Sequence, residues 1–464
     1  MENMTPRNNP KRRRKTKAEI IKEAYLPTVF LIITFVLVAI FVIGAGIRNA
    51  TKPSIYVPEQ NPSESTSSAL DLEAQQLMQD AALLALDYDF EAAATLLNTF
   101  SGDITSYPEL MAMRNQYLQD AANMITWSDP SQITTLSFHH LIADPARAFA
   151  DSRYGTSYNK NFVTVEEFRK ILTQLYDNGY ILVDLDDYTV CQENADGTVT
   201  CQAKPLQLPL GKKPLLLVQT NVNYYTYMVD SNQDGIADSG GAGFASCLVA
   251  DANGKIQCSM VNANGTTVTG EYDLVPILNS FIEAHPDFSY RGARAILSVT
   301  GYDGIFGYRT DPATKEEKGD AYYQDQIAGA QKVVNALRQQ GYRLACYTYN
   351  NAAYGKISAA EIQTDLRSWT AEVTPILGET NIMVFAQNSE LTEYAGTKYN
   401  VLQNAGFRYY LGFTSGNGGG EVSANHILLK RLLVTGSQMA HSNVYSRLFD
   451  VSSVLDPQRG NVPN

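Results

Sequence analysis

Basic residues and histidines are both scarce in this chain. Its 464 residues include 36 Lys and Arg against 48 Asp and Glu, a formal net charge of −12, and only five His. Nucleic acids and anionic polymers are held by basic surfaces, so this balance argues against either as the main partner. Few histidines also limit the transition-metal sites that the chain can build, because imidazole is a common ligand in such sites.

Charge is absent altogether from Ala24 to Ile47, a run long enough to span a bilayer as a helix. A cleaved signal peptide is the alternative, with Gly44-Ala45-Gly46 as its small-residue region, but its apolar part would be only about 7–15 residues long. The basic residues on the amino side of the run are Arg7, Lys11, Arg12, Arg13, Arg14, Lys15, Lys17 and Lys22. By the positive-inside rule the sequence predicts a single-pass cell-membrane protein, with residues 1–23 as a cytoplasmic tail, 24–47 as the transmembrane helix and the main domain extracellular.

Cysteine is sparse as well, and four of the five residues form two local pairs. Cys191 and Cys201 flank the turn sequence Asn194-Ala195-Asp196-Gly197, while Cys247 and Cys258 flank Asp251-Ala252-Asn253-Gly254. Both stretches are typical of hairpins whose arms bring two sulfurs opposite each other. We expect two disulfides, with reduced strand cysteines as the alternative. Neither pair has the Cys-x-x-Cys spacing that favours zinc.

Composition divides the rest of the chain into three parts. Residues 48–68 are rich in Pro, Ser, Asn and Thr, which predicts a flexible linker. Residues 69–130 have a helical pattern that resembles one tetratricopeptide-type hairpin, but no second copy follows, so we expect a short helical spacer. Residues 131–464 form the main domain.

In the main domain, apolar strands alternate with amphipathic helices. The expected strands are 134–142, 180–185, 215–222, 294–300, 343–349, 381–387, 409–414 and 432–436, and the expected helices are 165–178, 274–284, 325–340, 359–377 and 391–405. Four of these helices end at a glycine directly before the next strand, as left-handed helix caps do. The alternation predicts an α/β domain with a parallel sheet, most plausibly a barrel.

Several segments between Ser137 and Gly436, taken together, match a known protein family. The matching stretches are Phe138-His139, Leu141-Ile142, Asp144-Pro145, Arg147-Ala148-Phe149, 164–168, Gly179-Tyr180, 287–293, Gly301-Tyr302 and 307–310. In these stretches the chain resembles the NodB-homology polysaccharide deacetylases, in particular the subgroup found on bacterial surfaces. The resemblance implies a NodB-like (β/α) barrel, which would follow the transmembrane helix and the all-α spacer. It also implies removal of N-acetyl groups from glycans: one Asp acts as general base, while a second Asp and two His hold a divalent metal.

Other residues occupy the positions that carry this chemistry. Aligned on Val222-Asn223-Tyr224-Tyr225, the general base falls on Thr220 and the metal-binding Asp on Asn221. The family's His-Thr-Tyr-Gly-His motif corresponds to residues 347–351, so Tyr347 and Asn351 replace both metal-binding histidines. Thr is not a base at neutral pH, and a neutral amide is a poor zinc ligand. The resemblance therefore implies a degenerate site that holds no metal.

Aromatic residues would gather around this site. His139 matches a histidine of the family at a strand end, and many of the 28 tyrosines fall near the expected barrel mouth. Flat amphipathic rings suit stacking on sugars, although packing in the core and rim is the alternative for any one of them. The candidates for a substrate groove are His139, Tyr224, Tyr225, Tyr302 and Tyr349.

One stretch predicts a metal site of another kind. Residues 230–238 place Asp230, Asn232, Asp234, Ile236 and Asp238 at the first, third, fifth, seventh and ninth positions of a calcium loop, with Gly235 at the sixth. The twelfth position, Gly241, lacks the usual glutamate. We expect a structural Ca²⁺ site, with an ordinary Asp-Gly turn as the alternative.

Together these patterns favour a catalytically inactive, membrane-anchored relative of the deacetylases with a carbohydrate-binding or cell-envelope role, whose partner is a cell-wall or surface glycan. An active deacetylase with an atypical, zinc-dependent site is one alternative. A structural interaction protein of the envelope is the other.

Overall fold

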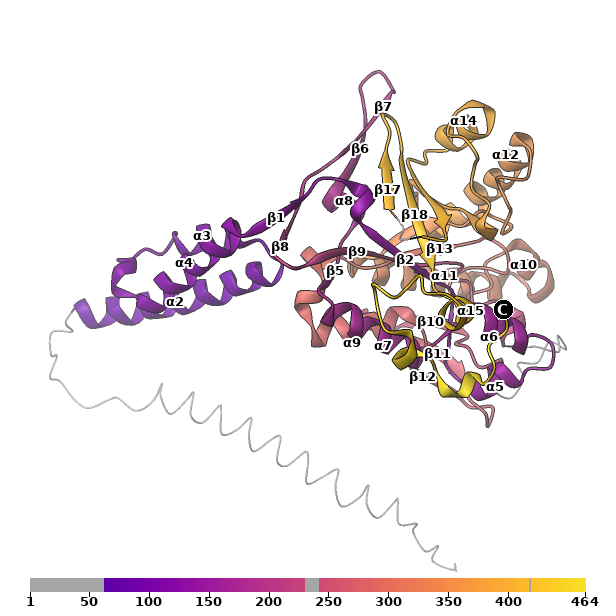
Figure 1. Cartoon of the computed structure of the whole chain (residues 1–464), viewed down its shortest axis with the longest axis horizontal. Coiled ribbons are helices and arrows are strands. Elements are labelled where there is room, and N and C mark those ends of the chain that lie inside the picture. Colours follow the sequence, from indigo (N-terminus) through magenta and orange to yellow (C-terminus); the bar gives the residue numbers. More distant parts are fainter. Residues whose placement is uncertain (1–61, 230–241, 417–418) are drawn as a thin grey trace, which may run out of the picture. The chain divides into compact units, whose positions relative to one another are not determined.

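The computed structural model describes residues 62–229, 242–416 and 419–464, with side chains from residue 69 onward (Figure 1). The chain divides into two compact units, and the second, Leu70–Asn464, contains the barrel and the sites discussed below.

A closed ring of parallel strands forms the centre of this unit. Its strands are β2 (Thr134–Phe138), β9 (Lys213–Gln219), β13 (Ile296–Val299), β14 (Arg343–Cys346), β15 (Ile382–Val384), β16 (Tyr409–Thr414) and β18 (Ile427–Leu433). They pair in the order β13-β14-β15-β16-β18-β2-β9, and β9 pairs with β13 to close the ring. Two further strands, β5 (Tyr180–Leu182) and β17 (Gly419–Val422), pair with β9 and β18 outside it. The ring fits the barrel that the alternation of strands and helices predicts.

Side chains alternate between the inside and the outside of this barrel. On β9, Leu216 and Val218 belong to one hydrophobic cluster, while Leu215 and Leu217 belong to the other. The first cluster also contains Ile296, Ala345, Val384, Leu411 and Leu429, one from each of five other strands, so it fills the barrel. The second includes Phe168 of helix α7 (Val165–Asp177) and Leu278 of helix α9 (Leu274–Ala284), so it lies between barrel and helices. This period of two is what a strand buried on both faces requires.

Helices and insertions surround the ring. The larger outer helices are α7, α9, α11 (Asp320–Gln339), α12 (Ala359–Ser368) and α14 (Gly396–Asn404). A π-helical turn, Trp369–Val373, joins α12 to α13 (Thr374–Leu377), where the sequence predicts one continuous helix. After β9 the chain inserts a small antiparallel sheet of β10 (Cys247–Ala250), β11 (Ile256–Val261) and β12 (Thr267–Gly270).

The amino-terminal helices of the described chain form their own small core. They are α2 (Pro62–Leu86), α3 (Phe90–Leu97) and α4 (Pro108–Ala122), and they bury Ala74, Ala81, Ala93, Leu97 and Leu110 together. Helix α2 begins inside the segment 48–68 that the composition predicts to be a linker. The Tyr88 hydroxyl donates to the Asp287 carbonyl at 2.5 Å, which connects this helical part to a barrel loop.

The expected transmembrane architecture is corrected. Among the helices of the described residues, none combines the length and the apolarity that crossing a bilayer requires. The longest, α2, carries Glu64, Asp71, Glu73 and Asp80. The segment 24–47, on which the expectation rested, lies outside the described residues. We therefore withdraw the transmembrane helix from the fold class, together with the membrane partner and the single-pass membrane localisation that depended on it.

The two cysteine pairs have different outcomes. Cys191 and Cys201 face each other across the hairpin of β6 (Thr189–Glu193) and β7 (Val199–Ala203) and are joined by a disulfide. The second expected bridge is absent, and both Cys247 and Cys258 are free. Cys258 stands opposite Leu248, one residue out of register with Cys247, so the two sulfurs point to opposite faces of the sheet.

Candidate functional site

A cavity of about 450 Å³ lies at the carboxyl ends of the barrel strands. Loops after four strands supply His139 and His140 after β2, Thr220 and Asn221 after β9, Tyr347 and Asn351 after β14, and Gln387 and Asn388 after β15. Helix α6 (Gly155–Asn161) and its flanks add Tyr154, Ser157, Tyr158, Asn161 and Phe162. The structure thus brings together His139, Thr220, Asn221, Tyr347 and Asn351, which the sequence places far apart.

Thr220 stands where the resemblance implies a general base. Its amide donates to the Phe138 carbonyl at 2.8 Å, and its hydroxyl lies 2.8 Å from Nδ1 of His139. Burial, and then the positive charge of Arg431, lower the pKa of His139 to about 3. The imidazole is therefore neutral at ordinary pH and a weak proton acceptor, so the pair gives the cavity hydrogen-bonding groups rather than a base.

The amide oxygen of Asn221 is already in use. The Tyr225 hydroxyl donates to it and also lies 2.9 Å from the Thr300 hydroxyl. Tyr225 is itself buried beneath the cavity rather than lining it. A hydrogen bond thus holds the side chain that replaces the expected metal-binding carboxylate.

A buried carboxylate holds the loop that follows β14. Asp365 of α12 accepts from the amides of Tyr349 and Asn350 at 2.6 and 3.0 Å, and from the Tyr354 hydroxyl at 2.7 Å. The Gln387 side chain donates to the Asn351 carbonyl at 2.7 Å, which ties this loop to the one after β15. These contacts fix the positions of Tyr347 and Asn351.

Left-handed backbone conformations concentrate at this end of the barrel. Ten non-glycine residues of the described chain have positive φ, and those in loops after barrel strands are Asn221, Tyr224, Asp303, Phe306, Thr348, Asn351, Gln387 and Asn388. Such conformations cost free energy and persist only where the surrounding structure imposes them. Four of these residues present amide side chains along the cavity, namely Asn221, Asn351, Gln387 and Asn388.

A second buried carboxylate supports the other side of the site. Asp273 accepts from the Leu141 and Leu274 amides, the Gln219 side chain and the Tyr224 hydroxyl, all within 3.0 Å. Its Oδ2 lies 3.0 Å from Nδ1 of His140, whose Nε2 accepts from the Tyr224 amide at 3.2 Å. His140 is therefore engaged on both nitrogens, and the network fixes the loop that carries Thr220 and Asn221.

The groove tyrosines fall in different places from those expected. Tyr224 is buried in the Asp273 network, and Tyr349 is packed against Gly301 with its hydroxyl bonded to Glu372. Tyr302 is 60% exposed and lies near Tyr225, with 5.8 Å between ring centroids, but it does not line the cavity.

Tyr154, Tyr158 and Tyr227 line the cavity in place of these tyrosines, together with Phe162 and Tyr347. Tyr154 and Tyr158 belong to helix α6 and its flank, a segment that no pattern in the sequence connected with the site. Tyr227 was one of many tyrosines in the expected mouth, and nothing in the sequence set it apart.

The donor set does not fit the divalent metal that the resemblance implies. No carboxylate or thiolate of the described residues lines the cavity, and the replaced positions offer a hydroxyl, a phenol and two amides. In the part of the chain that the structure describes, three His, Cys, Asp or Glu side chains nowhere gather as a metal site. Divalent ions of this kind require such ligands. The expected calcium loop, 230–238, lies outside the described residues.

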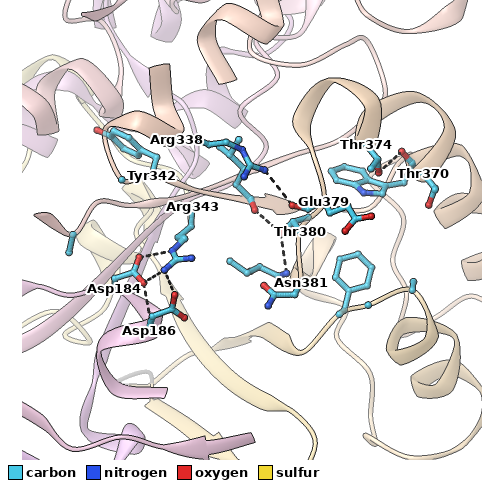
Figure 2. A pocket seen from close by; sticks show the side chains of 18 of the residues that line it. Asp184, Asp186, Arg338, Tyr342, Arg343, Thr370, Thr374, Glu379, Thr380 and Asn381 are labelled. Carbon is cyan, nitrogen blue, oxygen red and sulfur yellow. Dashed lines mark hydrogen bonds and ion pairs between the residues drawn. The ribbon is translucent and has the colours of Figure 1, made fainter. Parts of the chain in front are cut away.

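A larger cavity, of about 930 Å³, lies at the opposite end of the barrel (Figure 2). Several of its charged side chains already have partners within the protein. Arg343 is 2.6 Å from Asp184 and also bonds Asp186, while Arg338 donates to the Leu377 carbonyl at 2.9 Å. Burial raises the pKa of Asp187 to about 6, but its carboxylate closes the capping box of α8 (Leu185–Tyr188). This end joins strands to helices, as expected for the stability face of a barrel.

Comparisons with known proteins give little beyond this geometry. No protein-family model and no curated protein matches the chain. Among solved structures, a Streptococcus pyogenes deacetylase, PplD, in complex with acetate is similar at 13% sequence identity and a TM-score of 0.36, over 69% of this chain and 100% of that one.

Proposed function

We propose that this protein is a catalytically inactive, deacetylase-like barrel that binds a carbohydrate in the cavity formed by His139, Thr220, Asn221, Tyr347 and Asn351. The observation that carries the proposal is the uncharged lining of this cavity, in which no Asp, Glu, Lys or Arg of the described residues takes part. Amide hydrolysis in the family needs a base and a metal, and these side chains supply neither.

The remaining chemistry of the cavity suits a sugar. Amides from Asn221, Asn351, Gln387 and Asn388 can donate and accept hydrogen bonds, and Tyr154 and Tyr227 supply rings whose centroids are 5.4 Å apart. Ligand sites combine apolar rings with a few placed polar groups in this way, and a volume of about 450 Å³ is ample for one sugar ring.

Acetate release from the full-length protein tests the inactivity. With N-acetylated chitooligosaccharide or peptidoglycan and added Zn²⁺, we expect no acetate above that of a heat-inactivated sample. The variant Thr220→Asp, Asn221→Asp, Tyr347→His, Asn351→His restores the implied donors at positions that line one cavity. We expect it to bind Zn²⁺. Chelator-sensitive acetate release by the unmodified chain would overturn the proposal.

Binding of the glycan is measured separately from catalysis. We expect saturable binding of a sugar to the unmodified chain by ligand-observed NMR, with loss of binding when the cavity is filled by Ser157→Trp. A matched control, Ser446→Trp, places the same bulk on the surface near the carboxyl terminus and should leave binding intact, because Ser446 lies outside this cavity.

A further inference from the structure

Arg431 is the largest fully buried side chain of the described residues and is 1% exposed. It lies on β18 between Leu429 and Leu433, and Ile427 and Leu429 belong to the cluster that fills the barrel. Because side chains alternate along a strand, Arg431 points into the barrel as well. Its contact with Ser137 of β2 agrees with that direction.

The guanidinium has few partners for a buried cation. It donates to the Phe385 carbonyl at 2.7 Å and weakly to the Ser137 hydroxyl at 3.4 Å, and the Tyr347 hydroxyl is a further hydrogen-bond partner, while its Nε has none. Arginine has five N–H donors and stays protonated in proteins, so donor capacity and charge remain unsatisfied. No carboxylate of the described chain forms an ion pair with it. The negative charge of Glu390 favours the protonated form of Arg431, but the Glu390 carboxylate is paired with Lys430 at 2.6 Å.

Arg431 lies close to the cavity, because Leu433, two residues further along β18, lines it, and Ser137, which Arg431 contacts, precedes the lining residue His139 by two residues. The charge of Arg431 contributes to the lowered pKa of His139. The Tyr347 side chain interacts with the Arg431 guanidinium. His139 and Tyr347 both line the cavity. The positive potential of Arg431 therefore extends to the cavity wall, in surroundings where charges are poorly screened.

Two carboxylates near the cavity have hydrogen-bond donors or a cation of their own. Asp273, behind His140, accepts hydrogen bonds from two backbone amides and from the Gln219 and Tyr224 side chains, so its charge is spread over several donors. Asp303, beyond Tyr227, lies 3.3 Å from Arg309. Among the buried arginines of the described residues, Arg459 pairs with Glu167, whereas Arg431 has no carboxylate as an ion-pair partner.

We propose that the cavity recognises an acidic sugar, with the carboxylate of the ligand on the side of His139 and Tyr347, where Arg431 offsets its charge. The inference rests on the proposed function, because it names the class of carbohydrate that the same cavity binds. The place that the resemblance assigns to a divalent cation thereby becomes a place for an anion, and cationic amino sugars are disfavoured there.

Three sugars of nearly equal shape test this inference on the full chain. At neutral pH D-glucuronate is negatively charged, D-glucose is neutral and D-glucosamine is positively charged. Ligand-observed NMR gives a Kd for each. We expect glucuronate to bind roughly tenfold more tightly than glucose, and glucosamine more weakly than glucose. Equal binding of glucuronate and glucose would overturn the inference and leave carbohydrate binding in place. Failure of all three to bind would count against the proposed function itself.

Variants assign the preference to Arg431. In Arg431→Met, which keeps most of the volume, we expect the ratio of the glucuronate and glucose Kd values to fall to about one, a tenfold loss. Arg294→Met is the matched control, because Arg294 is also largely buried with an unpartnered Nε but lies at the amino end of β13, outside the cavity. A ratio that survives in Arg431→Met would overturn the assignment. If Arg431→Met does not fold, the order of the three Kd values in the unmodified chain still tests whether the cavity prefers an acidic sugar.

Inorganic phosphate distinguishes a sugar site from a general anion site. Displacement of glucuronate by an equal concentration of phosphate would overturn recognition of an acidic sugar. We expect no displacement, because phosphate cannot use the amides and rings along the cavity.

Discussion

At the residue scale, the cavity is lined by uncharged side chains. Thr220, Asn221, Tyr347 and Asn351 are all neutral, and burial together with Arg431 keeps His139 neutral by lowering its pKa to about 3. The buried charges that remain, Asp273, Asp365 and Arg431, lie behind this lining. The first two accept several hydrogen bonds each and hold loops in place, whereas Arg431 has no carboxylate as an ion-pair partner.

The lowered pKa of His139 predicts a pH-dependent stability. The unfolded chain takes up a proton as the pH falls below about 6.5, whereas the folded chain does not until about 3, so protonation favours unfolding. The contribution of His139 to stability is therefore present above about pH 6.5 and lost as the pH falls toward 3. Between pH 7 and pH 5 this loss is about 2 kcal/mol, and His139→Asn should abolish it.

Urea unfolding at both pH values measures the effect as the difference between the unmodified chain and the variant. His441→Asn, at an exposed histidine, is the control and should follow the unmodified chain. Identical pH dependence in His139→Asn and the unmodified chain would contradict the expected pKa.

Residue-level prediction placed four residues at one site where a motif set their spacing, and the structure brings them to one cavity, while their role stays a prediction. Thr220, Asn221, Tyr347 and Asn351 were found because neighbouring residues set the register of the resemblance. Arg431 was missed because a charged residue next to Lys430 indicates a solvent-exposed surface, and only the barrel shows that one side chain of the pair points inward. Gln387 and Asn388 were missed because no motif connects a loop amide with a cavity.

At the element scale, the carboxyl-terminal segment is held to the barrel by a buried ion pair. Arg459, in the 3₁₀ turn Pro457–Arg459, lies 2.5 Å from Glu167 of α7, and both side chains are at most 1% exposed. Arg459 also donates to the Asn159 and Phe162 carbonyls, at 2.7 and 2.6 Å. Glu167 at the same time closes the capping box of α7 with Thr164.

Loss of Arg459 should destabilise the fold strongly. In Arg459→Met the Glu167 carboxylate stays buried without its partner, which typically costs about 3–5 kcal/mol. The free energy of unfolding in urea measures this cost. Lys315→Met is the control, because its partner Asp320 is exposed, and such pairs contribute only about 0–1 kcal/mol. Equal effects of the two substitutions would show that burial of the pair does not matter.

Elements were predicted best where pattern and boundary signals coincide. The helix expected at 165–178 is α7, Val165–Asp177, which starts at a capping box and ends before Gly179. The strand expected at 432–436 is instead the end of β18, Ile427–Leu433, because Lys430 and Arg431 interrupt its apolar pattern. The prediction of a second disulfide was wrong for a related reason. The spacing of two cysteines does not reveal a register shift of one residue between β10 and β11.

At the scale of the whole molecule, we expect no gain in stability from a divalent metal, because no carboxylate or thiolate of the described residues lines the cavity. A ligand that binds only the folded state at 100 times its Kd adds about 2.7 kcal/mol to the free energy of unfolding. We expect Zn²⁺ to leave the Tm of the unmodified chain unchanged and to raise that of Thr220→Asp, Asn221→Asp, Tyr347→His, Asn351→His. A chelator-reversible rise in the Tm of the unmodified chain would contradict the expectation that its uncharged cavity binds no Zn²⁺.

The sequence by itself determined the parallel barrel and which residues follow its strands at the positions that the resemblance singles out. Apolar strands that alternate with amphipathic helices can bury both faces of a sheet in few other ways, and local motifs carry their own register. Tertiary structure decided which side chains meet. Ring closure through β9 and β13 brings loops after β2, β9, β14 and β15 to one cavity, and it turns Arg431 inward. The charge at a point in space depends on residues distant in sequence, so only the folded barrel reveals it.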